Sequence, residues 1–428
     1  MINDKKNLIN MKFNIYIYPI ISTILFTLYW GLGIKIFSYL GLIIYLIPVI
    51  FFNIEKSIII YYFILPNISL FKMSENSLAL SSIFIIAVFI KMILANKFKI
   101  DIKVFLLLIL YLISSTITYL FAKNNLSILI TEIRVIIDIL VVMSTIFIFK
   151  EQIEELYIKI SNSFIYGTIL ATTSGIIYPI LNGISINGYR LEAINSDPNY
   201  FSLCIAFCIS LIILNIYINK ASLMDLILIF VFIIAGLMSL SRGFLVAMIV
   251  NTLIIVYLLL TTSKIGIKNK VFILVFIIFI TCIISDSLNM IISNLFERLT
   301  SEEYSGGSGR VEIWIEYIYM WIENLQNLFF GVGETTKTMV NGHVQHNIFL
   351  EAITSKGIVG ASIIVSIYTY LYIFIKNKMN IKKIKLISYI PILTLGLGFL
   401  FLNGLLSDIG IMTIFLGIYA SNNYNKNR

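Results

Sequence analysis

The chain contains few of the side chains that usually carry chemistry in water. Its 428 residues include two histidines and three cysteines, and only 12% of the residues are charged. The cysteines (Cys204, Cys208 and Cys282) all fall in apolar segments, and we interpret them as packing residues rather than metal or redox groups. The scarcity of charge leaves no room for a soluble domain of conventional size.

The sequence is instead rich in apolar residues. Apolar residues make up 59% of the chain and the mean hydropathy is +0.97, which is typical of a polytopic membrane protein. A helix that crosses a bilayer needs roughly 20 mostly apolar residues. Such runs lie at 14–30, 34–53, 77–95, 102–121, 128–149, 160–182, 199–217, 223–240, 243–261, 270–288, 357–376, 385–402 and 404–420. A shorter run, 57–71, contains Pro66 and is either a span or a re-entrant piece.

We therefore predict an all-α integral membrane protein with 12–14 transmembrane helices, and fourteen is the preferred count. Residues 1–288 would hold transmembrane helices 1–11, with a short outer loop at 183–198. Residues 289–356 would form one long extracytoplasmic loop with an amphipathic helix, and 357–428 would hold the C-terminal transmembrane helices.

Basic residues set the expected orientation, because lysine and arginine concentrate in cytoplasmic loops. Lys5, Lys6 and Lys12 precede the first apolar run, which lacks a signal-peptide cleavage site and is read as an uncleaved helix. The segment 376–385 is rich in lysine. Both termini are thus expected in the cytoplasm, with the long polar stretch outside. On this reading the net charge of +9 reports topology and does not indicate nucleic-acid binding.

Arginine is rare and unevenly placed. The chain has six arginines against 25 lysines, and Arg190, Arg242, Arg298 and Arg310 all fall at predicted outer loops. A guanidinium is a planar fork of donors that fits phosphate in bidentate fashion, so an anion-binding cluster is favoured. Four residues are a small sample, and an arginine that snorkels to the membrane surface is the plain alternative for Arg242.

The segment from Arg310 onward is expected to be an amphipathic helix. Glycines precede it at 306, 307 and 309, and free amides at a helix N-terminus beside a guanidinium would make an anion seat. Glu312, Glu316 and Glu323 share one face, while Trp314 and Trp321 suit the lipid headgroup level. Packing against neighbouring spans explains the same pattern equally well. We expect Gly331 and Gly333 to end this helix.

Both histidines lie in the same polar stretch. His343 and His346 have the spacing of two metal ligands, and Glu334 and Glu351 lie nearby, but no further histidine or nearby cysteine completes a metal site. A general base is better motivated, because an imidazole can take a proton from a hydroxyl near neutral pH. Asn347, the neighbour of His346, can position a substrate or cap the helix that follows.

The order of these features resembles the O-antigen ligase and O-antigen polymerase family of membrane glycosyltransferases. The resemblance extends from about residue 185 to 360 and involves a chain-ordered set of short motifs. They are Arg190, Asp197-Pro198-Asn199, Ser241-Arg242-Gly243, Arg310, Trp314, Gly331 with Gly333, and His346-Asn347. Before and after this region only the layout of apolar segments agrees.

The resemblance implies an inverting, metal-independent glycosyltransferase of surface polysaccharide biosynthesis that uses no cofactor. The donor would be an oligosaccharide on undecaprenyl pyrophosphate, bound by Arg190, Arg242 and Arg310, and His346 would be the catalytic base. Asn347, Gly331, Gly333 and Trp314 would support the site. The reaction would occur at the outer face of the cytoplasmic membrane, within the bilayer and alongside other polysaccharide-assembly membrane proteins.

Alternatives remain at this point. The acceptor would be a second lipid-linked glycan for a polymerase, which we favour, or a lipid A-core sugar for a ligase. A flippase for lipid-linked oligosaccharide would share the hydropathy, but functional charges near the bilayer midplane and internal repeats would be expected, and no repeat is visible. A sensory or structural membrane protein would not need arginine, histidine and glycine collected in this order.

The topology predicts a difference in chemical accessibility. A cysteine introduced by Ser305→Cys should react with a membrane-impermeant thiol reagent in intact cells, and one introduced by Asn380→Cys should react only after the cells are opened, because positive loops stay inside. Labelling of position 380 alone in intact cells would invert the orientation.

Overall fold

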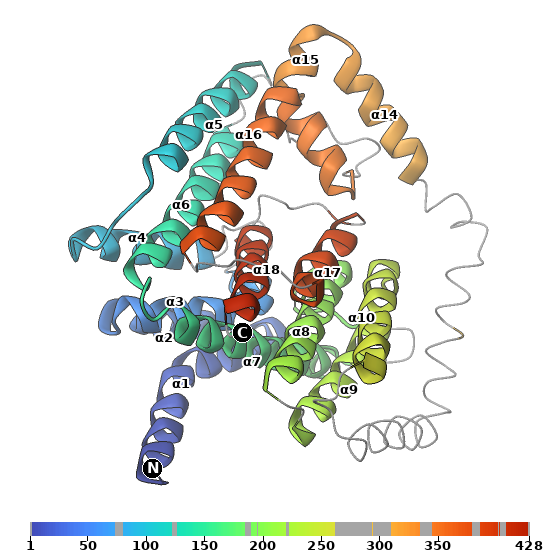
Figure 1. The fold of residues 1–428 in the computed structure, drawn as a ribbon. Coiled ribbons are helices and arrows are strands. Elements are labelled where there is room, and N and C mark those ends of the chain that lie inside the picture. Colours follow the sequence, from blue (N-terminus) through green and yellow to red (C-terminus); the bar gives the residue numbers. More distant parts are fainter. Residues whose placement is uncertain are drawn as a thin grey trace.

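The structure is a computed structural model, and it is all-helical wherever the chain is described (Figure 1). The described residues are 2–72, 80–121, 126–184, 190–194, 196–219, 222–261, 293, 310–333, 345–378, 386–400, 402 and 408–426. No strand occurs among them, as expected from the sequence.

Among the described residues, five helices contain a stretch that is long and apolar enough to cross a membrane. They are α1 (Ile2–Leu32), α5 (Ile102–Phe121), α7 (Ile153–Leu181), α8 (Pro198–Asn219) and α16 (Ile348–Lys378). The surfaces of α1, α5, α7 and α16 carry many exposed large apolar side chains, which favours contact with lipid rather than water. The coarse prediction of a helical protein with several potential membrane spans is therefore confirmed.

Other apolar helices are shorter or carry charge. Shorter apolar stretches lie in α2 (Lys35–Phe51), α3 (Ile54–Ile64), α4 (Leu80–Leu94), α9 (Leu223–Met238), α10 (Arg242–Thr261), α17 (Ile390–Phe399) and α18 (Asp408–Lys426). Helix α6 (Leu126–Ile148) is long, but it contains Glu132, Arg134 and Asp138. The predicted run at 270–288 lies outside the described residues, and the count of 12–14 spans stays a prediction.

The apolar run at 57–71 is divided by its proline. Helix α3 ends at Ile64, and a 3-10 helix, η1 (Leu65–Leu70), follows with Pro66 in its first turn. A second 3-10 helix, η2 (Leu386–Tyr389), leads directly into α17. Proline explains the change at η1, since its ring excludes the regular α-helical hydrogen bond at that position.

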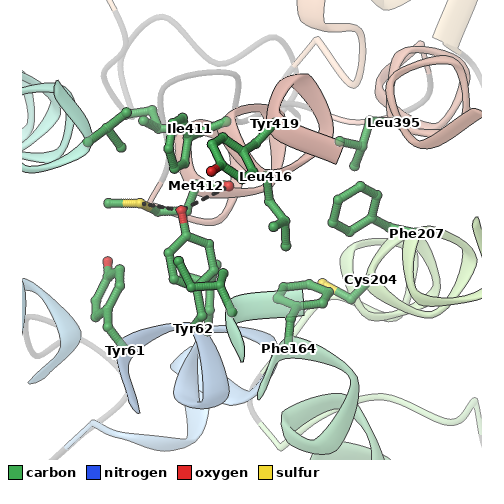
Figure 2. Packing of buried hydrophobic residues seen from close by; sticks show 14 of the residues in the cluster. Tyr61, Tyr62, Phe164, Cys204, Phe207, Leu395, Ile411, Met412, Leu416 and Tyr419 are labelled. Atoms are coloured by element: carbon green, nitrogen blue, oxygen red, sulfur yellow. Dashed lines mark hydrogen bonds between the residues drawn. The ribbon is translucent and has the colours of Figure 1, made fainter. Parts of the chain in front are cut away.

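Helix α8 lies at the centre of the packing. Within its apolar window 78% of the residues are buried, against 28–50% in the other four long helices. Figure 2 shows the core beside it, where Phe207 of α8 packs near Phe164 of α7, with ring centroids 5.4 Å apart. Tyr62 of α3 donates a hydrogen bond to the carbonyl of Met412 in α18 at 3.4 Å. This core ties early and late parts of the chain together.

The amphipathic segment after Arg310 differs from the expectation. We predicted one helix ended by Gly331 and Gly333, but the structure has two, α14 (Arg310–Ile322) and α15 (Leu325–Phe330). The break falls at Glu323 and Asn324, where the Asn324 side chain accepts a hydrogen bond from the amide of Asn327 at 2.8 Å. That capping bond starts a new helix and turns the chain, so Glu323 does not extend the acidic face of α14.

Helix α16 starts nine residues before the predicted span at 357–376 and bends at Gly357. This residue has φ 65° and ψ −179°, a combination that is available essentially only to glycine. The carbonyls of Thr354 and Ser355 beside the bend accept hydrogen bonds from the amides of Val332 (2.9 Å) and Gly333 (3.1 Å). The segment 331–333 therefore lies directly against the bend (Figure 1).

A buried ion pair lies next to the bend. Lys356, the residue before Gly357, contacts the carboxylate of Glu132 in α6, and Tyr111 of α5 donates to the other oxygen of the same carboxylate. The exposed fractions of the Lys356 and Glu132 side chains are 7% and 1%. Removal of one partner from such a pair strands a buried charge, so the pair fixes α16 against α5 and α6.

We expect substitution by alanine to lower the stability of the protein at Gly357, in the bend, and to raise it at Gly396, in α17. Gly357→Ala should destabilise the protein by about 2 kcal/mol or more, because alanine is strained at this φ and its Cβ would overlap the backbone of Phe329. Gly396→Ala is the control: Gly396 is in helix α17, its added Cβ meets nothing within 4 Å, and alanine favours helix by about 1 kcal/mol. Thermal unfolding of the purified protein in detergent measures both. A neutral Gly357→Ala would contradict the assigned bend.

Candidate functional site

Arg190 lies in the segment that leads into α8. Its Nε donates a hydrogen bond to the carbonyl of Ser239 at 3.2 Å, and its Nη2 lies 3.5 Å from the amide oxygen of Asn199. The amide of Leu191 donates to the carbonyl of Met238 at 2.9 Å. These contacts hold the segment 190–194 on the turn that joins α9 to α10.

The rest of this segment is buried in the helix bundle. Leu191, Ala193 and Ile194 are at most 1% exposed, and Ser69 of η1 donates a hydrogen bond to the carbonyl of Ile194 at 2.9 Å. Gly175 of α7 lies directly under the backbone of Glu192, where any Cβ would overlap the carbonyl. The loop is thus a fixed wall of the site, although the sequence around it is polar.

Arg242 is the first residue of α10. The turn before it contains Leu240, which has φ 50°, and Ser241, whose hydroxyl accepts a hydrogen bond from the amide of Phe244 at 3.4 Å. Serine in this place is a usual helix N-cap. Arg190 donates a hydrogen bond to the carbonyl of Ser239 in the same turn, so Arg190 and Arg242 both lie at the α9–α10 turn.

Arg310 begins α14 and is half-buried. Burial lowers the pKa of its guanidinium, the positive charge of Arg242 lowers it further, and the negative charge of Asp197 acts in the opposite direction. Arg310 and Arg242 are therefore close enough to repel each other, although 68 positions separate them in the sequence. Asp197 lies near enough to offset part of that repulsion.

Glu192 interacts electrostatically with both Arg190 and Asp197. Burial raises the pKa of Glu192 to about 7, the positive charge of Arg190 opposes the increase, and the negative charge of Asp197 adds to it. Asp197 therefore acts on both Glu192 and Arg310. Asp197 thus lies near Glu192, which interacts with Arg190, and near Arg310, which is itself close to Arg242. It also caps α8 by accepting a hydrogen bond from the amide of Asn199 at 2.6 Å.

His346 lies just before α16 and is half-buried, with φ 48°. Its neighbour Asn347 accepts hydrogen bonds from the amides of Phe349 (3.0 Å) and Leu350 (3.1 Å), so Asn347 caps the helix. On the other side, Trp314 of α14 donates from Nε1 to the carbonyl of Gln345 at 2.6 Å. The backbone of His346 is thereby held between a helix cap and a tryptophan anchor.

Trp314 connects the histidine to the arginines. It follows Arg310 by four residues in α14, which places both on one helix face about 6 Å apart along the axis. The indole of Trp314 donates a hydrogen bond to Gln345, the residue before His346. The charges of Arg242 and Asp197 act on Arg310, which lies in the same helix as Trp314. His346 thus belongs to the same end of the molecule as the arginine group.

Gly331 and Gly333 have structural roles here. Their φ values are 79° and 75°, and a Cβ at Gly331 would overlap the backbone of Ser355 in α16. They let the chain after α15 approach the bend closely. His343, Arg298 and the glycines at 306, 307 and 309 lie outside the described residues. In the part of the chain that the structure describes, no group of three or more His, Cys, Asp or Glu side chains could hold a metal ion.

Sequence reasoning missed the acidic members of the site. Asp197 was noted only as part of the motif Asp197-Pro198-Asn199, with no charge role, and Glu192 was not considered. The signal was present, because both carboxylates occur within seven residues of Arg190 in YRLEAINSD. Three guanidiniums, two carboxylates and an imidazole at a half-buried surface can bind a multiply charged anion and accept a proton beside it.

Comparison with known proteins gives no match: none of the known family models matches this chain, and no curated protein does.

The raised pKa of Glu192 predicts a pH-dependent stability difference. The folded protein keeps this proton up to about pH 7, whereas an unfolded glutamate loses it near pH 4.3, so the folded state loses stability as the pH rises between these values. Glu192→Gln stays neutral throughout. Its unfolding temperature should equal that of the wild type at pH 4 and exceed it at pH 8.

Thermal unfolding in detergent at both pH values measures this difference. Glu312→Gln, at an exposed position of α14, controls for the general loss of one negative charge. A Glu192→Gln protein that is less stable than the wild type at pH 8 would mean that Glu192 acts as a stabilising anion instead.

Proposed function

We propose that this protein is a membrane glycosyltransferase of the O-antigen polymerase or ligase type. It would transfer a glycan from undecaprenyl pyrophosphate to the hydroxyl of a glycan acceptor at the outer face of the cytoplasmic membrane. The observation that carries the proposal is a series of interactions. Arg310 lies near Arg242 and Asp197, and Asp197 acts on Glu192, which interacts with Arg190. Trp314, one helical turn after Arg310, donates a hydrogen bond to the residue before His346.

The site supports the chemistry of this transfer. The acceptor oxygen attacks the anomeric carbon while the bond from that carbon to the diphosphate oxygen breaks, and the configuration inverts. The hydroxyl proton passes to His346, which is the proposed general base. Negative charge develops on the departing diphosphate, where the guanidiniums stabilise it without a metal ion.

The repulsion between Arg242 and Arg310 favours an anionic ligand. Like charges that a fold holds together raise the free energy of the empty site, and Asp197 offsets this only in part. A diphosphate supplies the missing negative charge and accepts several charge-assisted hydrogen bonds. The acceptor distinguishes polymerase from ligase, and polymerase remains our preference. A flippase for the same lipid would use the arginines without a base.

The proposal predicts different roles for the two histidines. His346→Ala should lower glycan transfer by about 100-fold or more, since general base catalysis contributes about 100- to 10,000-fold. His343→Ala is the matched control and should keep substantial activity. Growth of labelled glycan chains in membranes, normalised to protein abundance, measures both. Equal losses in the two variants with rescue by zinc would support a metal site instead.

The arginines should be sensitive to a conservative change. Lysine keeps the charge but loses the planar fork, so Arg242→Lys and Arg310→Lys should each reduce transfer about tenfold or more. Lys35→Arg, at an exposed position far from these arginines in the sequence, controls for the effect of exchanging one basic residue for another. Full glycan transfer by both lysine variants would refute bidentate diphosphate binding, and lipid translocation without any transfer would favour the flippase.

A further inference from the structure

A cavity of about 290 Å³ lies between α16, α17 and α18, as far as the described residues define it. Thirteen residues line it, and only Tyr368 and Thr369 among them have polar side-chain atoms. Large apolar residues, including Leu395 of α17 and Ile414 of α18, form the remaining wall. A ligand of this cavity must therefore be hydrocarbon.

The bend in α16 creates this cavity. Residues before the bend (Ile348, Phe349 and Ala352) and residues after it (from Ala361 to Thr369) line the same space. A straight helix would carry these two groups away from each other. Figure 1 shows the two halves of α16 diverging from the bend, with α17 and α18 beyond them.

The cavity begins at the candidate site. Ile348 and Phe349 are the first two residues of α16, and His346 lies two positions before Ile348. Asn347, between them, caps the helix. One end of the cavity is thus within two residues of the proposed base.

The cavity is also open to its surroundings. Phe349 is 62% exposed and Val365 is 64% exposed, although both line the cavity. At Gly396 an added Cβ would meet nothing within 4 Å, so the wall leaves space there as well. In a membrane such an opening admits a chain sideways from the lipid, whereas a sealed core would not.

We propose that this cavity binds the hydrocarbon chain of a polyprenyl diphosphate whose head group occupies the arginine site. The inference rests on the proposed function and adds the location of the lipid tail. A cationic seat next to an apolar cavity fits an amphiphile with one negatively charged end. A soluble sugar nucleotide has no part that would fill this cavity, so the donor must be lipid-linked.

Photolabelling of the full chain in nanodiscs tests the location without requiring transfer. The probe is undecaprenyl diphosphate with a diazirine in the isoprene units nearest the diphosphate. Peptides containing residues 361–369 and 392–399 should carry the label. Excess unlabelled undecaprenyl diphosphate should remove the label, and geranyl diphosphate at the same concentration should not, because it lacks most of the chain.

Gly396→Leu places its Cβ where nothing lies within 4 Å and extends its side chain into the cavity. It should weaken probe binding about tenfold, since displacing two buried methylene groups is worth about that factor. Ser366→Leu is the matched control. It adds the same side chain to an exposed position of α16 that does not line the cavity, and it should bind the probe as the wild type does.

The outcomes separate this proposal from the proposed function. Label spread over the exposed apolar helices, or unchanged by Gly396→Leu, overturns the cavity as the tail site even if glycan transfer is intact. Specific label that Gly396→Leu abolishes supports the tail site even if no transfer is found, and in that case only the transferase assignment fails.

Discussion

The bend of α16 at Gly357 is the constraint on which the rest of this architecture depends. It requires a backbone conformation that glycine alone adopts readily, and it frees carbonyls that accept hydrogen bonds from Val332 and Gly333. The ion pair of Lys356 with Glu132 fixes the helix on one side of the bend. The first half of α16 therefore has a direction of its own, which carries His346 toward α14 and leaves a cavity between the two halves.

The arginine group (Arg190, Arg242 and Arg310) depends on how other elements pack. Guanidiniums held close together repel each other, and the negative charge of Asp197, at the end of the loop before α8, offsets part of this repulsion at Arg310. The loop is fixed by α7, η1 and the α9–α10 turn, and Arg190 itself contributes a hydrogen bond to that turn. A site built in this way keeps its positive charges in place before any ligand arrives, which reduces the reorganisation needed on binding.

The part of the fold that could be read from the sequence follows from periodicity and local chemistry. Apolar runs gave the helical class, Pro66 marked the end of α3, and Asn347 was correctly considered as a helix cap. The break at Glu323 and Asn324 was missed, because the pattern of α14 continues through it and a single asparagine cap is a weak signal. The continuity of the helix capped by Asn347 with the span predicted at 357–376 was missed, because Glu351 and Lys356 gave residues 348–356 the composition of a polar loop.

The sequence by itself determined the class of protein and the kinds of groups available: a hydrocarbon-rich helical chain with a few arginines, carboxylates and one histidine pair in its polar segments. Only the tertiary structure decided which of these meet. Arg242 and Arg310 are far apart in the chain, and their electrostatic interaction depends on how α10, α14 and the loop before α8 pack. Local sequence encodes backbone preference within a few residues, whereas charge interactions and cavities arise from distances between elements, which no local pattern specifies.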